Sequence, residues 1–288
     1  MPLGIDIGAS TWLWASPFTT ETADKLFPKI ASMGFDCVEI AVEDPSLIDP
    51  GKVADSLRRN NLKPLLCGAF GADRDLTHED PSVHRACLRY IRDCLDLCAA
   101  LGCGFLGGPM YSAVGKARMV PDDQRKREWE RAVTNLREAC RMAGDLGIRL
   151  ALEPLNRFES DLVNTAGDVK RLIRDIGHPA AGIMLDGFHM NIEERDVFEA
   201  ITTAGEDLIH MQVSENYRGT PGTGQTRWED YRRGLDAIAY GGAVTIESFT
   251  TDNRSLAGAV CFWHPMAESQ DAFAADGLAF LRKWAAGA

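Results

Sequence analysis

The chain has 288 residues and a formal net charge of −11, from 31 Lys and Arg against 42 Asp and Glu. This acidic excess argues against a nucleic-acid partner, since proteins that bind nucleic acids concentrate Lys and Arg. No apolar run approaches the ~20 residues that cross a bilayer. The N-terminus lacks the basic and apolar regions of a signal peptide. We therefore expect a cytoplasmic protein without a membrane partner, and we expect its eight cysteines, none in a CxxC pair, to be free and buried.

Short apolar runs alternate with amphipathic segments along the whole chain. The predicted strands are Leu3–Ile7, Cys37–Ala41, Lys63–Cys67, Phe105–Gly108, Arg149–Glu153, Gly182–Asp186, Ile209–Ser214 and Ala243–Glu247. The predicted helices are Thr20–Met33, Gly51–Asn60, Pro81–Ala100, Pro121–Leu146, Ala166–Ile176, Glu194–Thr202, Trp228–Ile238 and Ser269–Trp284. Eight strand–helix repeats favour a closed barrel over an open sheet. We predict an α/β protein formed by a single (β/α)8 TIM-barrel domain, residues 1–288.

Polar residues stand at the ends of the later strands, where such barrels carry their chemistry. Strand five ends at Glu153, strand six at Asp186 and strand eight at Glu247, and strand seven contains His210 and Gln212. Three carboxylates in one mouth repel each other, so protons or a cation must offset their charge. Oxygen ligands suit Mg²⁺ or Mn²⁺, and a mixed oxygen and nitrogen set suits Mn²⁺ or Co²⁺. The alternative is a network of salt bridges to arginines: Arg149, Arg157 and Arg218.

Two further features surround this predicted mouth. Trp12 and Trp14 follow strand one, and they can either wall a sugar pocket or pack at the barrel rim. The glycine-rich run 219–224 follows strand seven, where many barrels bind phosphate, but it lacks the Gly-Lys-Ser/Thr ending of a P-loop. Only Arg218 and Arg227 supply positive charge nearby, which favours an unphosphorylated ligand. A mobile lid is an equally good interpretation of this run.

Three stretches at strand ends carry a resemblance to a known family. They are residues 152–159 (Leu-Glu-Pro-Leu-Asn-Arg-Phe-Glu), 185–194 (Leu-Asp-Gly-Phe-His-Met-Asn-Ile-Glu-Glu) and 215–222 (Glu-Asn-Tyr-Arg-Gly-Thr-Pro-Gly), and residues 34–40 are similar too. The chain resembles the D-tagatose 3-epimerase/D-psicose (allulose) 3-epimerase family of xylose-isomerase-like TIM barrels. The resemblance implies a metal-dependent isomerase that acts on an unphosphorylated ketose and forms homodimers or homotetramers.

The resemblance also implies a site. The family holds a divalent metal, Mn²⁺ first with Co²⁺ or Mg²⁺ as alternatives, by two glutamates, an aspartate and a histidine. Glu153, Asp186 and Glu247 match the acidic ligands, but the histidine position falls on Gln212. His210 is the rival ligand, two residues earlier on the same strand and therefore one layer deeper. The positions that bind substrate in the family match Glu159, His189 and Arg218.

The implied mechanism is epimerisation through a cis-enediolate. The metal chelates the carbonyl oxygen and a neighbouring hydroxyl of the open-chain ketose, while Glu153 and Glu247 act as acid and base on opposite faces. Simpler roles stay open for the binding residues. Glu159 can pair with Arg157, His189 can be a buried structural imidazole, and Arg218 can lie on a surface loop.

Three other functions stay open. The departure at Gln212 makes β-elimination on a 3-keto sugar or glycoside, of the deglycosidase type, the main alternative to a ketose 3-epimerase or sugar isomerase. Zinc-dependent abasic-site endonucleases share this barrel, but they need more histidine ligands, and the negative net charge opposes DNA binding. A non-catalytic sugar-binding barrel predicts neither a metal nor proton exchange.

Overall fold

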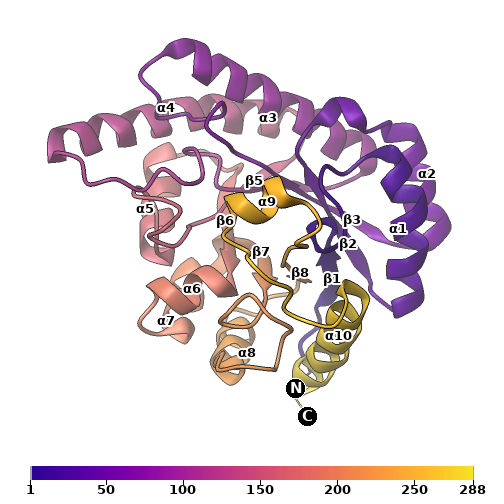
Figure 1. The fold of residues 1–288 in the computed structure, drawn as a ribbon. Coiled ribbons are helices and arrows are strands. Elements are labelled where there is room, and N and C mark those ends of the chain that lie inside the picture. Colours follow the sequence, from indigo (N-terminus) through magenta and orange to yellow (C-terminus); the bar gives the residue numbers. More distant parts are fainter. Residues whose placement is uncertain (1, 288) are drawn as a thin grey trace.

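The computed structural model describes residues 2–287 and shows a closed barrel of eight parallel strands. Each strand pairs with its neighbours in chain order, and β8 pairs with β1 to close the ring. Figure 1 shows the helices arranged around these strands. The predicted TIM barrel is confirmed. The strands are β1 (Asp6–Ser10), β2 (Cys37–Val42), β3 (Lys63–Gly68), β4 (Phe105–Gly108), β5 (Arg149–Leu152), β6 (Ala181–Asp186), β7 (Leu208–Val213) and β8 (Ala243–Ile246).

Most of the helices begin where the sequence supplies a side-chain cap; the helices that follow Pro121 and Arg227 do not. Thr165 and Asp168 form a reciprocal capping box at the start of α5, and α1 begins after the capping residue Thr19. Both helices have the bounds that the sequence predicts. The helices are α1 (Thr20–Met33), α2 (Pro50–Asn60), α3 (Pro81–Leu101), α4 (Asp122–Asp145), α5 (Ala166–Ile176), α6 (Gly187–Glu193), α7 (Val197–Ala204), α8 (Trp228–Ala237), α9 (Arg254–Ala259) and α10 (Gln270–Ala286).

Four elements differ from the sequence prediction by three residues or more. The first strand is Asp6–Ser10 rather than Leu3–Ile7, because the barrel interior selects small residues there: a Cβ on Gly8 would lie 2.5 Å from the Cys37 sulfur. The helix predicted over Glu194–Thr202 begins only at Val197. The short helices α6 and α9 were not predicted, since seven and six residues are too few to show a helical period.

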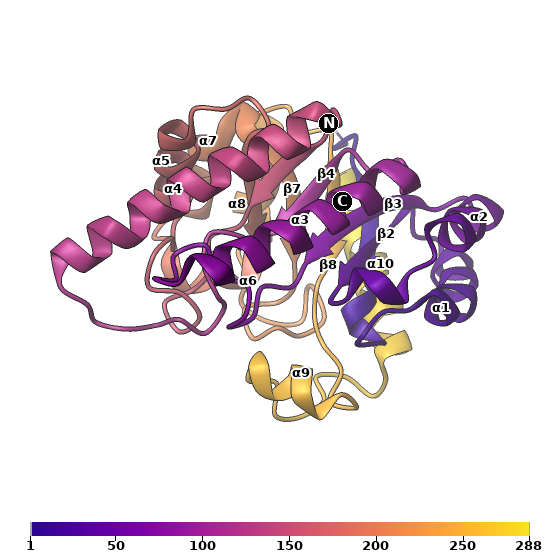
Figure 2. The same ribbon diagram turned by 90° about the horizontal axis from the view of Figure 1, so that it is seen from above.

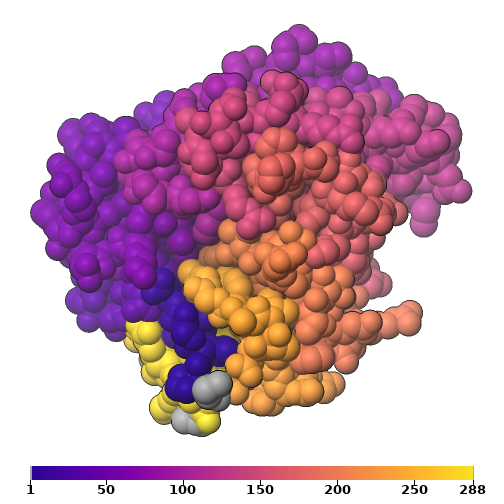
Figure 3. Space-filling model, turned by 180° about the vertical axis from the view of Figure 1, so that it is seen from behind, coloured from indigo at the N-terminus to yellow at the C-terminus, as the bar shows by residue number. Residues whose placement is uncertain are grey.

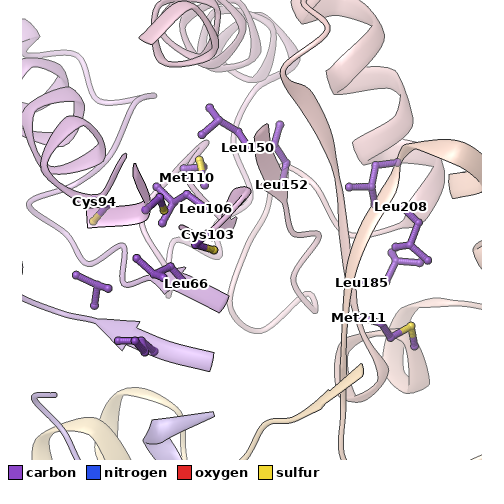
Figure 4. Close-up of a cluster of buried hydrophobic side chains, with 14 of the residues drawn as sticks. Leu66, Cys94, Cys103, Leu106, Met110, Leu150, Leu152, Leu185, Leu208 and Met211 are labelled. Carbon is purple, nitrogen blue, oxygen red and sulfur yellow. The ribbon is translucent and has the colours of Figure 1, made fainter. Parts of the chain in front are cut away.

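The strands alternate between two apolar layers. Leu150 and Leu152 of β5 pack toward the helices together with Leu106 of β4, as Figure 4 shows. Ala151, between them, belongs instead to the cluster inside the barrel, with Met184 and others. Since successive side chains of a strand point to opposite faces, the next inward position on β5 after Ala151 is Glu153. The same alternation places Asp186 two residues after Met184.

Helix α9 and the segment around it cover one end of the barrel. Figures 1 and 2, at right angles, both show α9 apart from the ring of helices, over the end where the strands finish. The opposite end carries both chain ends: the Leu3 amide donates to the Ala285 carbonyl at 2.8 Å, and Figure 3 shows these segments side by side. A site at the strand ends therefore lies under α9 and far from the termini.

The cysteines and the helices test two of the expectations drawn from composition. All eight cysteines are free, and seven are buried as predicted, but Cys261 is exposed because it follows α9 on the surface. Within residues 2–287, no helix combines the length and the hydropathy that a membrane span requires.

Candidate active site

A cavity of about 350 Å³ opens at the strand ends. Its polar wall contains Glu153, Glu159, His189, Arg218 and Glu247, all predicted from the sequence. Asp186 and Gln212 are fully buried and contact these lining residues rather than the cavity itself. The opposite wall is apolar and includes Trp12, Phe70, Leu155, Phe249, Leu256 and Val260. The structure thus gathers all seven predicted site residues at one mouth. Trp14 instead donates to Asp271 outside it.

One arginine serves two of the three strand-end carboxylates. Arg218 contacts Asp186 through Nη1, and its Nη2 lies 2.9 Å from Glu247 Oε2. Arg157 pairs instead with Glu193 at 2.9 Å, and Arg149 donates to the Ala181 carbonyl at 3.3 Å. The arginine network that the sequence left open therefore exists only in part. Within residues 2–287, no arginine forms a salt bridge with Glu153.

The shortage of positive charge determines which carboxylates hold protons. Burial raises the pKa of Glu153 well above its usual range, and the charges of Glu247 and Asp186 raise it further. Burial also raises the pKa of Glu247, in spite of the neighbouring Arg218. Asp186 behaves differently: although burial opposes its ionisation, the neighbouring Arg218 guanidinium lowers its pKa. The mouth therefore contains one carboxyl group whose ionised form is favoured and two whose ionised forms are disfavoured.

His189 has a defined tautomer. Its Nδ1 accepts from the Asn156 amide nitrogen at 3.2 Å and from Asn156 Nδ2 at 2.8 Å. The Asn156 side chain is oriented unambiguously, because its Oδ1 accepts from the Phe158 amide while Nδ2 also donates to Glu159 Oε1. Burial lowers the pKa of His189 and keeps the ring neutral. A neutral imidazole has one proton, which here must sit on Nε2.

This tautomer decides what His189 can do. Single ligand atoms of Glu153, Asp186 and His189 lie within 4.8 Å of one another, a spacing that suits a metal ion. However, a ring nitrogen that carries a proton cannot bind a metal. His189 Nε2, at 3.5 Å from Glu153 and 3.7 Å from Asp186, is instead a hydrogen-bond donor toward an oxygen in the cavity.

Gln212 lies at the same level of the barrel as Asp186, and its side-chain oxygen is available to bind a metal ion. In the β6–β7 register it stands opposite Asp186, whereas His210 stands opposite Met184, one layer deeper. Gln212 Nε2 donates to Glu247 Oε1 at 3.0 Å, while its Oε1 is buried without a hydrogen-bond partner. A buried unpaired carbonyl oxygen is energetically costly. Oxygen donors are what Mg²⁺ and Mn²⁺ prefer. The residues present therefore fit a divalent cation.

The loop after β7 positions Arg218 inside the mouth. Arg218 is 7% exposed and adopts a positive φ of 68°, so it is not the surface residue that the sequence left open. The loop is closed by Glu215, whose carboxylate accepts from the amides of Gly222 at 2.9 Å and Thr226 at 2.6 Å. Because a carboxylate occupies these amides, the glycine-rich run does not offer them to a phosphate.

Sequence reasoning missed two residues of this site. Asn156, which fixes the tautomer of His189, lies within a stretch that carried the family resemblance but received no role of its own. Glu39 is fully buried on β2 and contacts both His210 and Gln212. The available signal was a lone carboxylate in an otherwise apolar strand, since a buried charge must be hydrogen-bonded.

A family model described as "Xylose isomerase-like TIM barrel" matches residues 27–284. The chain belongs to this family. It is 30% identical over 283 residues to a "Probable ketose 3-epimerase" of Synechocystis sp., covering 97% of this chain and 96% of that protein. It is 29% identical to an L-ribulose 3-epimerase of Methylomonas sp., covering 98% of both. The predicted resemblance to the D-tagatose/D-psicose 3-epimerases is confirmed, and with it the prediction of an isomerase-class enzyme.

Solved structures agree with this assignment. The crystal structure of D-allulose 3-epimerase from Methylomonas sp. in complex with D-allulose matches with a TM-score of 0.91 and 29% identity, covering 98% of each chain. The 3-keto-D-glucoside 4-epimerase of E. coli, at 24% identity and a TM-score of 0.78, shares the fold. These comparisons favour epimerase chemistry over the β-elimination that the departure at Gln212 left open.

Proposed function

We propose that this protein is a ketose 3-epimerase that acts on an unphosphorylated ketose. The observation that carries the proposal is the pair Glu153 and Glu247, two buried glutamates with raised pKa values that reach one cavity from β5 and β8. An epimerase needs a proton acceptor on one face of a carbon and a proton donor on the other. Carboxyl groups whose pKa values are raised suit both tasks.

The metal site in this proposal consists of Glu153, Asp186, Gln212 and Glu247. The excess of negative charge over Arg218 and the unpaired Oε1 of Gln212 support this set. Mn²⁺ is the first candidate, with Mg²⁺ and Co²⁺ as alternatives. A bound divalent cation would act as a Lewis acid and stabilise the negative charge that develops on the substrate oxygens.

The proton transfers belong to the chain's own glutamates. One of Glu153 and Glu247, in its ionised form, removes the proton from C3 of the ketose. The other, in its protonated form, donates to the opposite face of the same carbon. In the reverse direction the two exchange roles, which requires both side chains to change protonation state within the cavity. Their burial excludes the water that would otherwise compete for these protons.

Three residues orient the sugar. His189 donates from Nε2, because Asn156 occupies Nδ1. Glu159 uses Oε1 to accept from Asn156, so its second oxygen is available to a sugar hydroxyl. Arg218 reaches the cavity from the loop after β7 and supplies positive charge near the reacting oxygens. Glu215 already accepts from the Gly222 and Thr226 amides of that loop, which supports an unphosphorylated substrate.

Two expectations from the sequence belong to the same proposal. A homodimer or homotetramer is expected from the resemblance to the 3-epimerases, and light scattering of the purified protein measures it directly. A cytoplasmic location is expected from the composition, and fractionation of the source cells tests it.

An epimerisation assay tests the proposed function. Metal-free protein is supplied with Mn²⁺ and incubated with D-fructose, D-tagatose, D-allulose or L-ribulose, and with a ketose phosphate as the control. Chromatography is expected to show the C3 epimer of at least one free ketose and no conversion of the phosphate. Conversion of the phosphorylated sugar alone, or no conversion of any ketose by protein with bound metal, would contradict the proposal.

A further inference from the structure

One further buried carboxylate, Glu39, lies one layer deeper in the barrel than the predicted metal site. Glu39, on β2, is fully buried inside the barrel. Its Oε2 is 2.6 Å from His210 Nε2 and accepts from Thr245 Oγ1 at 3.1 Å. Its Oε1 accepts from Gln212 Nε2 at 2.6 Å. Neither the cavity nor the proposed proton transfers use Glu39, so its burial needs another explanation.

The contacts of Gln212 allow only one orientation of its amide. Nε2 has two hydrogens, and it donates to two carboxylates, Glu39 Oε1 and Glu247 Oε1. Rotating the amide by 180° would remove both bonds and turn Oε1 toward two acceptors. Leaving these buried polar groups unpaired is costly, so the rotated form is strongly disfavoured. The Oε1 atom is thereby held in the direction where it has no protein partner.

We infer that Glu39 is a positioning residue for Gln212, which fixes the amide so that Oε1 faces the bound cation. A histidine ligand is commonly oriented by a carboxylate on its other ring nitrogen. In this chain Glu39 orients a neutral amide instead. The oxygen and nitrogen ends of an amide are nearly the same size, so without Glu39 either end could face the ion. The inference rests on the proposed function, because it takes Gln212 to be a metal ligand.

The test measures Mn²⁺ affinity by calorimetry on folded protein, without reference to turnover. Glu39→Met removes the acceptor while preserving side-chain length, and it is expected to weaken Mn²⁺ binding about 10–100-fold, the usual effect of losing such a partner. Glu39→Gln is the conservative rescue. Its Oε1 still accepts from Gln212 while its amide nitrogen faces His210, so near-normal affinity is expected.

A double-mutant cycle separates positioning from general packing. In the Gln212→Ala background, Glu39→Met is expected to have no further effect on Mn²⁺ affinity, because the group that it positions is absent. Thr245→Val is the matched control, since it removes hydrogen bonds to Glu39 and His210 beside Gln212 but leaves both hydrogen bonds of the Gln212 amide in place. This control is expected to leave the affinity within twofold. An equal loss from Glu39→Met in both backgrounds would overturn the inference.

The outcomes also distinguish this inference from the proposed function. If Gln212→Ala weakens Mn²⁺ binding but Glu39→Met does not, the positioning role is wrong and the proposed site stands. If Gln212→Ala binds Mn²⁺ as wild type does, the proposed ligand set fails, and the inference fails with it. Should Glu39→Met not fold, a crystal structure of the Mn²⁺-loaded wild type decides. Gln212 Oε1 on the ion and Nε2 on Glu39 are expected, and any other arrangement overturns the inference.

Discussion

Two clusters of buried carboxylates in this molecule have opposite electrostatics. On the side of the barrel, Arg118 contacts Glu128 at 2.8 Å and Asp161 at 3.0 Å, and Arg125 contacts Asp161 at 2.9 Å. These arginines lower the pKa values of Glu128 and Asp161, although burial opposes this shift. At the mouth, three carboxylates share the single Arg218, and the pKa values of Glu153 and Glu247 are raised.

The difference lies in the balance of charge rather than in burial. Two arginines balance two carboxylates in the side cluster, which is the arrangement expected of a structural ion network. The mouth has three carboxyl groups and one arginine, so full ionisation would leave negative charge that the described residues do not offset. An arrangement that destabilises its own ionised form is typical of a functional site. We therefore assign chemistry to the unbalanced cluster at the mouth and a structural role to the balanced cluster.

The largest effect is expected from neutralising either glutamate of the mouth. Glu153→Gln and Glu247→Gln remove a group that transfers protons, so kcat for epimerisation should fall about 10²–10⁴-fold. Metal-free Glu153→Gln should melt no lower than wild type, because Glu153 forms no salt bridge with an arginine of residues 2–287 and its charge is opposed by burial and by Glu247 and Asp186. Steady-state kinetics with Mn²⁺ measure the fall in kcat, and thermal melts in chelator measure the stability of the metal-free protein. Wild-type turnover in either variant would contradict the assigned roles.

Removing the one arginine of the mouth should be nearly as severe. Arg218→Met leaves Asp186 and Glu247 without their buried partner, and losing one member of a buried ion pair typically costs about 3–5 kcal/mol. The free energy of unfolding in chelator measures this loss. Added Mn²⁺ should restore part of it in the variant, since a cation at the mouth replaces missing positive charge. Equal stability with and without Mn²⁺ would argue against a cation site there.

Neutralising the balanced cluster should change stability without changing catalysis. Glu128→Gln removes charge-assisted hydrogen bonds from Arg118 and should lower the free energy of unfolding by about 1–2 kcal/mol. Its kcat/KM should stay within twofold of wild type, because Glu128 lies outside the cavity. Denaturant unfolding and the epimerase assay together test this. A large loss of activity in well-folded protein would contradict the division between the two clusters.

The smallest effect is a pH dependence of stability with a defined sign. The folded pKa values of Glu128 and Asp161 are lowered, so the cluster contributes stability above the unfolded values, about 4.3 and 3.9. This contribution is lost as pH falls from there through the folded values. The stability difference between wild type and Glu128→Gln should therefore be constant at neutral pH and shrink below about pH 4. A difference that grows in acid would reverse the assigned sign.

The sequence predicts the barrel well because eight apolar runs and their intervening helices repeat over the whole chain. It also places the acidic residues, since a strand end is visible as the first polar residue after an apolar run. The contacts that give those residues their properties are not visible in the same way. Asn156 reaches His189 across 33 positions, and Glu39 reaches Gln212 across 173, so no local period relates them. The predicted position of the first strand is wrong for a related reason. A glycine is required at position 8 because the Cys37 side chain packs against it, and Cys37 is distant in the sequence.

Exchange with deuterated solvent reports directly on the proton transfers that we assign to Glu153 and Glu247. Protein loaded with Mn²⁺ is incubated in D₂O with a ketose that it converts, and the recovered sugars are examined by NMR. Transfer of protons by Glu153 and Glu247 predicts that the product epimer carries deuterium at C3, and that both carboxamide variants form this epimer about 10²–10⁴-fold more slowly. An epimer without deuterium at C3, or with deuterium only at another carbon, would contradict the account.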